Sequence, residues 1–261
     1  MPRYFIEVAY KGTNYSGFQV QDNAGSVQEE VEKALGVYFR SAPALTGSSR
    51  TDTGVHARQN FFHVDFESII DPSCIYNINA ILPPDIVILN ITPVVAEAHC
   101  RFDAVSREYR YYVYGEKDPF MADRAYFFPY PLDLGKLNEA AALVLRHTDF
   151  TAFSKKRTQV RSFICSIEES RWMMEAGSLI YQVRANRFLR GMVRGLVGTM
   201  LQVGREKMSL DRFREILRQK DNRQVDFSVP GHGLFLFRVN YPVSVWQHTT
   251  AETDRAGASP Q

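Results

Sequence analysis

The sequence predicts an α+β protein built from two related halves. Stretches of alternating or β-branched apolar residues, typical of strands, occur between amphipathic stretches typical of helices. These stretches follow a broadly similar order in both parts of the chain, although no sequence repeat occurs. The 261 residues, of which 45% are hydrophobic and 23% charged, suit a globular protein with a sizeable core. We therefore expect an N-terminal half over residues 1–102, a C-terminal half over 103–246 and a polar, disordered tail over 247–261.

The N-terminal half is expected to contain one helix and four strands. Ser26 followed by Glu29 forms a capping box ahead of apolar residues at helical spacing, which predicts that a helix begins there. A loop over residues 47–58 is expected between the second and third strands. The strands are expected over Arg3–Ala9, Ala44–Thr46, Asn60–Phe66 and Ile86–Ile91.

The C-terminal half is expected to contain three helices and four strands. Asp133 and Ser209 are suited to cap two helices, the first of which should run to about Arg146. A longer helix between these two is expected to end near Gln202. The strands are expected over Glu108–Tyr114, Ser162–Ile167, Leu179–Ala185 and Gly233–Val239.

Several classes of protein are disfavoured by composition. No apolar run reaches the roughly 18 residues that a membrane span needs. Arg3 and Glu7 interrupt the N-terminus, which argues against a signal peptide, so we expect a cytoplasmic protein.

The cysteines favour neither a disulfide framework nor a metal site. Cys74, Cys100 and Cys165 are odd in number and far apart, so we expect reduced thiols in the core. His99 next to Cys100 is a pair of metal-binding residue types, but no further ligand follows at a fixed spacing. No metal is therefore expected.

The distribution of charge favours RNA more than the net charge of +2 does. One stretch without carboxylates contains Arg184, Arg187, Arg190 and Arg194, and a second contains Lys155, Lys156, Arg157 and Arg161. Local positive fields of this kind attract polyanions. A solvated basic face is the alternative interpretation of either cluster.

The loop around Asp52 contains the residues best suited to chemistry. Asp52 lies between Gly47 and Gly54, and Arg50 is two positions away. In an extended loop these two side chains can point the same way, so the guanidinium would keep the carboxylate ionised, ready to act as a base or nucleophile. The alternative is a structural turn in which Asp52 accepts hydrogen bonds from backbone amides.

The same loop resembles a known signature. The residues from Arg50 to Ala57 are similar to the pattern R-T-D-x-G-V-H-A of the TruA family of tRNA pseudouridine synthases. The chain departs from the family's common residues by having Lys11 for Asp, Phe18 for Trp, Cys100 for Ala and Arg187 for Ala. Eight further matches occur in the family's order: Tyr10–Gln19, Ser26–Gln28, Leu82–Ile86, Arg101-Phe102 with Arg107–Tyr111, His147–Thr151, Phe188–Arg190 with Met192–Arg194, Gly198 with Val203-Gly204, and Gly233–Leu236.

The resemblance implies a fold, a reaction and partners. The expected fold is a mixed antiparallel sheet with flanking helices, built from two RRM-like halves around a central basic cleft. The expected enzyme is an isomerase, an intramolecular transferase that converts uridine to pseudouridine at positions 38, 39 and 40 in the anticodon stem-loop of tRNA. It flips the target base out of the RNA, needs no cofactor or metal, and acts as a homodimer.

The resemblance also assigns roles to residues. Asp52 is the expected catalytic carboxylate, and three routes are open to it: attack on C6 of the uracil, action at C1′ of the ribose, or removal of the C2′ proton. Tyr109 is expected to stack on the uracil, Arg194 to pair with Asp52, and Arg50 to orient Asp52 or a phosphate. Weaker RNA contacts are expected from Lys155, Lys156, Arg157, Arg187 and Arg190.

The surroundings of these residues leave structural alternatives open. Tyr109 could instead be a core tyrosine of a strand. Arg187, Arg190 and Arg194, at spacings of three and four, should share one face of the long helix, where they could also be solvent-exposed. The Gly residues beside them would allow a strand or an RNA backbone to approach closely.

Two other functions compete with this expectation. A non-catalytic RNA-binding protein on the same fold fits the composition equally well, but it gains nothing from a carboxylate in a basic groove. An Asp-dependent nucleosidase or glycosidase would normally use paired carboxylates, and no convincing second acid lies near Asp52 in the sequence.

Overall fold

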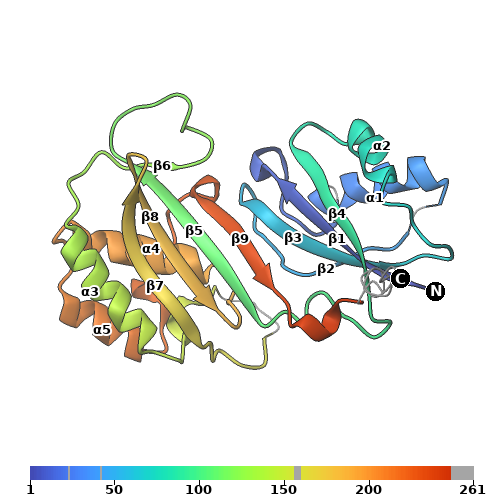
Figure 1. The fold of residues 1–261 in the computed structure, drawn as a ribbon. Coiled ribbons are helices and arrows are strands. Elements are labelled where there is room, and N and C mark those ends of the chain that lie inside the picture. Colours follow the sequence, from blue (N-terminus) through green and yellow to red (C-terminus); the bar gives the residue numbers. More distant parts are fainter. Residues whose placement is uncertain (23, 42, 156–159, 248–261) are drawn as a thin grey trace, which may run out of the picture.

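The computed structural model describes residues 1–22, 24–41, 43–155 and 160–247 and confirms the α+β class (Figure 1). Within these residues one sheet has the strand order β4-β1-β3-β9-β5-β8-β7, with β2 added to β3 and β6 added to β5. The strands are β1 (Arg3–Tyr10), β2 (Thr46–Gly47), β3 (His56–Asp65), β4 (Ile86–Val94), β5 (Ser106–Tyr114), β6 (Tyr126–Phe127), β7 (Ile167–Glu175), β8 (Ser178–Ala185) and β9 (Leu234–Asn240).

Strand β9 joins the two parts of the sheet. It comes from the end of the described chain, yet it lies in the middle of the sheet between β3 and β5 (Figure 1). It pairs in parallel with β3, where His56 and Ala57 face Phe235 and Leu236, and antiparallel with β5. This pairing explains why β3 begins at His56, four residues before the start that the sequence predicts.

The helices flank the sheet, and their predicted N-caps are confirmed. Helices α1 (Val27–Phe39) and α2 (Cys74–Ile81) accompany the N-terminal strands, while α3 (Leu134–Leu145), α4 (Met192–Gly204) and α5 (Leu210–Arg218) accompany the C-terminal strands (Figure 1). The backbone N–H of Glu29 donates to Ser26 Oγ at 3.2 Å. Asp133 and Ser209 accept the corresponding bonds at 3.0 and 3.1 Å, which satisfies a free amide at each helix start.

One predicted strand is wrong. Of the predicted range 162–167, only Ile167 belongs to a strand, as the first residue of β7; before it the structure has an isolated bridge between Ile164 and Asp149. Strand β7 lies at an edge of the sheet, and its exposed or half-buried residues include Glu168, Glu169 and Arg171. Its sequence therefore lacks a clear alternation of apolar and polar residues, the pattern from which strands are predicted. The short elements α2 and β6 were not predicted. Of the predicted tail, residues 248–261 lie outside the described part.

The buried apolar side chains form one cluster that includes residues of both halves. The three cysteines are free and buried, as the sequence predicts. Among the helices of the described residues, none combines the length and the apolar character that crossing a bilayer requires.

Candidate active site

Asp52 lies in the loop between β2 and β3, and its carboxylate is available. The side chain is half-buried. The turn at Asp52 is closed by its main chain and not by its side chain, because Val55 N–H donates to the Asp52 carbonyl oxygen at 3.1 Å. Among the described residues, no hydrogen bond or ion pair to the Asp52 carboxylate is found. The alternative of a carboxylate occupied by backbone amides is therefore not supported.

The loop is held in place from the N-terminal side. Tyr10 Oη lies 2.8 Å from Thr51 Oγ1, and Phe18 N–H donates to the Thr51 carbonyl at 3.1 Å. Gly17 has a φ of +122°, and a Cβ added there would lie 2.9 Å from the Thr51 carbonyl oxygen. Only glycine fits this position without strain, so the Gly17 turn fixes the backbone next to Asp52.

His56 supports the loop as a neutral imidazole. Its Nδ1 accepts a hydrogen bond from Gly12 N–H at 3.0 Å, so the other nitrogen bears the proton and donates to the His232 carbonyl at 3.0 Å. Burial lowers the pKa of His56 below its ordinary value, which agrees with this form. The ring therefore connects the loop to the C-terminal part of the chain.

Residues 229–233, called the 229–233 connection here, link the loop to β5 and α4. Tyr111 Oη donates to the Pro230 carbonyl at 2.9 Å, and Arg194 Nε donates to the Val229 carbonyl at 2.8 Å. Gly231 lies against the loop, where an added Cβ would be 2.5 Å from the Thr53 carbonyl oxygen. Sequence reasoning missed this segment, although Pro-Gly followed by His-Gly is a turn pattern.

Tyr109 shares the surroundings of Asp52. It belongs to β5, is buried, and packs edge-to-face on Phe188 with ring centroids 5.0 Å apart. Burial raises the pKa of the Tyr109 hydroxyl to about 12; the Arg107 guanidinium opposes this rise and the Asp52 carboxylate adds to it. The charge of Asp52 is thus felt at Tyr109, and the structure brings these two predicted residues together.

Arg194 and Arg50, the two arginines expected beside Asp52, make no ion pair with it among the described residues. Arg194 lies on α4, as predicted, but its Nε is bonded to the 229–233 connection. Arg50 is exposed. The predicted pairing of Arg194 with Asp52 is therefore not seen among the described residues, while the role predicted for Arg50, to orient Asp52 or a phosphate, stays a prediction.

The other predicted RNA contacts lie before α4 or outside the described residues. Helix α4 begins at Met192, after Gly191 with a φ of +75°, so Arg187 and Arg190 lie in a loop and the prediction that they share a helical face with Arg194 is wrong. Lys155 covers Gly191 and donates its backbone N–H to the Arg190 carbonyl at 3.0 Å. Lys156 and Arg157 lie outside the described residues. The close approach expected beside the helix glycines is made by a backbone, that of Asp226 against Gly198.

Four guanidinium groups form an arginine cluster next to this site. Partial desolvation lowers the pKa of Arg101, and the positive charges of Arg50, Arg107 and Arg187 lower it further. Arg107 is fixed by bonds from its Nε to Ser49 Oγ at 3.0 Å and from its second nitrogen to the Arg101 carbonyl at 2.9 Å. The sequence motifs include Arg101 and Arg107, but reasoning from residue types had not selected them.

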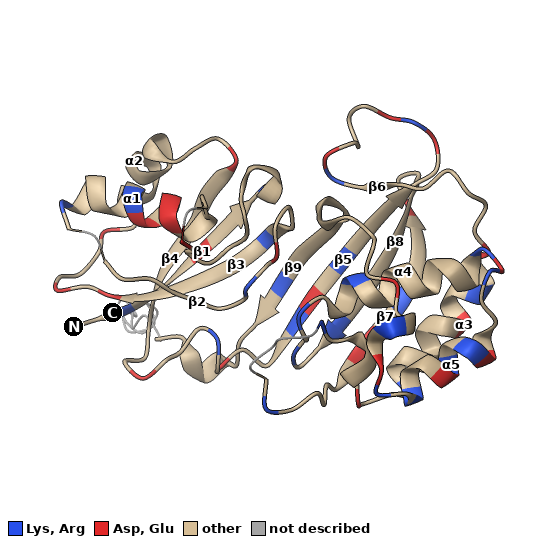
Figure 2. Cartoon of the chain, turned by 180° about the vertical axis from the view of Figure 1, so that it is seen from behind, with Lys and Arg blue, Asp and Glu red and all other residues tan. Residues whose placement is uncertain are grey.

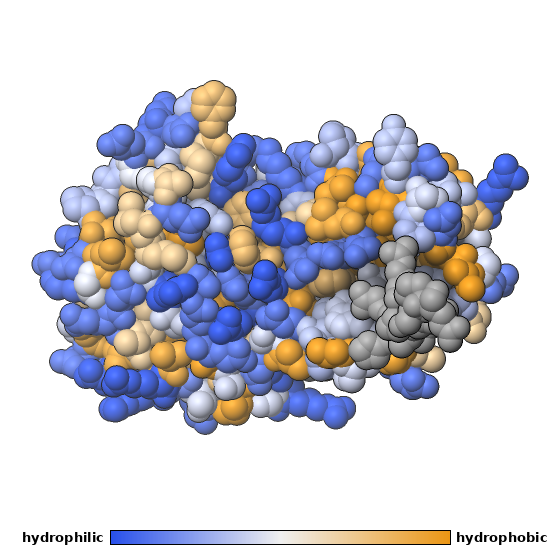
Figure 3. Space-filling model, viewed as in Figure 1, coloured by the Kyte–Doolittle hydropathy of each residue, from blue (hydrophilic) through white to orange (hydrophobic). Residues whose placement is uncertain are grey.

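Polar and basic residues gather between the two halves of the molecule (Figure 2 and Figure 3). Figure 2 shows basic positions on β3, β9 and β5, near the junction of the two parts of the sheet. Figure 3 shows hydrophilic side chains in the middle of the opposite view, between more apolar areas on either side. Repulsion among like charges in the arginine cluster would be relieved by an anion.

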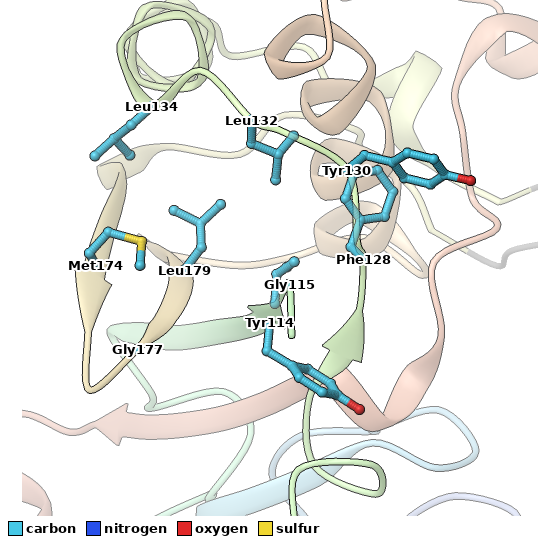
Figure 4. A pocket seen from close by; sticks show the side chains of 10 residues that line it. Tyr114, Gly115, Phe128, Tyr130, Leu132, Leu134, Met174, Gly177 and Leu179 are labelled. Carbon is cyan, nitrogen blue, oxygen red and sulfur yellow. The ribbon is translucent and has the colours of Figure 1, made fainter. Parts of the chain in front are cut away.

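A cavity elsewhere does not belong to this site. It has a volume of about 170 Å³ and lies at the far end of the C-terminal strands, lined by residues such as Tyr114, Phe128, Leu132 and Leu179 (Figure 4). Its lining is mostly apolar and contains none of the candidate site residues.

Comparisons with known proteins agree with these features. The profile of a family described as tRNA pseudouridine synthase matches residues 140–242. The chain is 44% identical to tRNA pseudouridine synthase A of Parabacteroides distasonis over 93% of this chain and 97% of that protein. It is 42% identical to the protein of the same name from Bacteroides thetaiotaomicron, over 97% and 96% of the two chains. It is 37% identical to the one from Staphylococcus aureus MRSA252, over 91% of each. With identity of this level along nearly the whole chain, the protein belongs to the tRNA pseudouridine synthase A (TruA) family.

Proposed function

We propose that this protein converts uridine to pseudouridine at positions 38, 39 and 40 in the anticodon stem-loop of tRNA, with Asp52 as its catalytic carboxylate. The observation that carries the proposal is the state of Asp52. Its carboxylate is half-buried, has no partner among the described residues, and lies in a loop fixed from both halves. Such a group is free to act on a nucleoside.

The reaction exchanges one glycosidic bond for another. The bond from N1 of the uracil to C1′ of the ribose breaks, a bond from C5 to C1′ forms, the C5 proton leaves to solvent, and N1 takes up a proton from solvent. Asp52 can take part by attack on C6, by action at C1′ or by removal of the C2′ proton. Each route requires the ionised carboxylate beside the nucleoside in a site with little water, where electrostatic effects are large.

Tyr109 is the residue we assign to the uracil. The target base must leave its stack, which costs a few kcal/mol, and stacking on an aromatic ring offsets about 1–3 kcal/mol. Tyr109 is held on Phe188 and feels the charge of Asp52, so a base stacked there would lie close to the carboxylate. The hydroxyl is un-ionised at neutral pH, as that of an ordinary tyrosine is, and burial raises its pKa further, to about 12.

The arginine cluster supports a central basic cleft for the tRNA backbone. Arg50, Arg101, Arg107 and Arg187 come from four separate segments and are close enough to lower the pKa of one of them. Phosphates bound there would replace repulsion by attraction and would release counterions. We assign Arg194 to support of the 229–233 connection and of Asp52, and Lys155 and Arg190 to weaker contacts.

The larger organisation is proposed on the same basis. Two RRM-like halves, 1–102 and 103–246, would meet at the segment between β4 and β5, with β9 completing the sheet between them. We also propose a homodimer, which light scattering of the purified protein would detect as twice the mass of 29.9 kDa. Because tRNA would be the substrate, we place the protein in the cytoplasm.

The test must separate a synthase from an RNA-binding protein and from a nucleosidase. The purified protein is incubated with tRNA that contains [5-³H]uridine, and the products are checked for abasic sites. A synthase releases tritium to water and leaves every base attached. A binding protein releases no tritium, and a nucleosidase leaves abasic RNA; either result would overturn the proposal. Sequencing of pseudouridines in the product tests the three positions.

A further inference from the structure

A cluster of metal-binding residue types lies apart from Asp52. His63 belongs to β3, while His99 and Cys100 follow β4 in the segment that connects the two halves. One ligand atom from each of these residues lies within 4.8 Å of the other two. His63 Nδ1 is 3.2 Å from Cys100 Sγ, and the two imidazole centroids are 4.5 Å apart. The neighbouring pair in the sequence thus gains a third ligand from 37 positions away.

In the folded chain, Nδ1 of both imidazoles accepts a hydrogen bond from a backbone N–H. Cys100 N–H donates to His63 Nδ1 at 3.3 Å, and Arg101 N–H donates to His99 Nδ1 at 3.2 Å. A ring nitrogen that accepts a hydrogen bond is unprotonated, which is the form that binds a metal ion, so zinc bound at Nδ1 takes the place of the backbone N–H donor. The Cys100 thiol donates to the Thr46 carbonyl at 3.1 Å, so binding through sulfur releases this proton.

The spacing of the ligand atoms suits zinc. Tetrahedral zinc with bonds of about 2.0–2.3 Å holds its nitrogen and sulfur ligands roughly 3.3–3.7 Å apart. The His63–Cys100 separation is already close to this value. The other separations are within 4.8 Å, so His99, which is only half-buried, has to move toward the other two ligands for all three to reach this spacing. The exposed Phe102 ring packs on His99, with ring centroids 4.2 Å apart.

The charges around the cluster are mixed rather than uniformly positive. Arg3 is paired with Asp65 through two hydrogen bonds of 2.7 and 2.8 Å. Asp103 accepts the His99 backbone N–H at 2.7 Å. Thiolate sulfur and imidazole nitrogen are both ligand types that zinc binds in proteins, and water can fill the fourth position of such a site.

We propose that His63, His99 and Cys100 form a zinc site that fastens the segment between the halves to β3. Cys100 stands where the TruA pattern commonly has Ala, so the site is a feature of this sequence and not a part of the isomerisation. Binding forms one Zn–S and two Zn–N bonds in place of water ligands of the hydrated ion and releases the thiol proton of Cys100 to solvent.

Metal binding to the purified, metal-free protein tests the proposal. Zinc is titrated in competition with a chromophoric chelator, and cobalt(II) is used as a spectroscopic probe of thiolate ligation. The wild type should bind one equivalent and show a sulfur-to-cobalt charge-transfer band. Cys100→Ala should lose this band and bind zinc at least about a hundredfold more weakly. His99→Asn, at a half-buried position, should weaken binding while keeping the band.

Cys165→Ala is the matched control, because Cys165 is equally buried but is not part of the cluster. It should keep both the band and the affinity. Circular dichroism establishes that each variant is folded, and Ala is the residue that the TruA pattern tolerates at position 100. Absence of the band in the wild type, or equal zinc affinity in wild type and Cys100→Ala, would overturn the site.

Discussion

The Asp52 carboxylate is half-buried and has no hydrogen-bond or ion-pair partner among the described residues. The sequence predicts a catalytic role for Asp52 through the resemblance of its loop to the TruA signature, because the glycines and the carboxylate alone also fit a structural turn. It could not identify the partners of the arginines. Arg194 is bonded to the Val229 carbonyl, 35 positions away, and only the folded chain brings this acceptor to α4.

Replacement of Asp52 should therefore separate activity from stability. Asp52→Asn keeps the size of the side chain and removes its charge. Tritium release should fall at least about a thousandfold, because the neutral amide cannot act as the base or the nucleophile that the carboxylate provides. The free energy of unfolding should change by less than about 0.5 kcal/mol, because no described bond to the carboxylate is lost.

The measurements are tritium release under saturating tRNA and urea denaturation of both proteins. Asp22→Asn serves as the control, because Asp22 is an exposed carboxylate in the same half. It should leave both quantities unchanged. Retention of wild-type turnover by Asp52→Asn would refute the assigned chemistry.

At the level of elements, the sequence predicted what local chemistry determines. Ser26, Asp133 and Ser209 cap helices as expected, because a cap depends on residues three positions apart. The edge strand β7 was missed because one of its faces is polar. The insertion of β9 beside β3 was also missed, since pairing between distant strands leaves no local pattern.

The 229–233 connection is the element on which the site depends most. Gly231 touches the loop so closely that an added Cβ would be 2.5 Å from the Thr53 carbonyl oxygen. Gly231→Ala must therefore displace backbone, and we expect a loss of about 1–3 kcal/mol in the free energy of unfolding. Because the displaced carbonyl is next to Asp52, turnover should also fall at least about tenfold, as small misplacements of a catalytic group are costly.

Gly25→Ala provides the comparison for this variant. Nothing lies within 4 Å of a Cβ added to Gly25, so unfolding and turnover should stay close to the wild type. Equal behaviour of the two variants in urea denaturation and tritium release would show that the connection does not position the loop.

At the scale of the whole molecule, buried tyrosines should limit stability at high pH. Burial is the largest cause that raises their hydroxyl pKa values, so the folded protein keeps protons that the unfolded chain loses above about pH 10. The stability that these groups supply is complete below pH 10 and is lost as the pH rises above it. The residues concerned are Tyr10, Tyr109, Tyr111, Tyr181 and Tyr241.

Tyr181→Phe tests this expectation. It removes one such hydroxyl, so the fall in the free energy of unfolding above pH 10 should become shallower by about 1.4 kcal/mol per pH unit. Tyr76→Phe is the control, because Tyr76 is 82% exposed and should not alter the slope. Urea denaturation from pH 8 to 11 measures both; equal slopes for Tyr181→Phe and the wild type would contradict the argument.

The arginine cluster makes a further prediction about the complete molecule with tRNA. A net charge of only +2 gives little overall attraction, so affinity must come from where the cations gather. If Arg101 contacts one phosphate, Arg101→Ala should weaken tRNA binding and reduce the dependence of log affinity on log salt by about 0.7–0.9. Arg212→Ala is the control, since Arg212 on α5 is paired with Glu215 and lies outside the cluster. Filter binding from low to high salt measures both slopes. An unchanged slope for Arg101→Ala would mean that the cluster faces no phosphate, and the path of the tRNA would have to be sought elsewhere on the sheet.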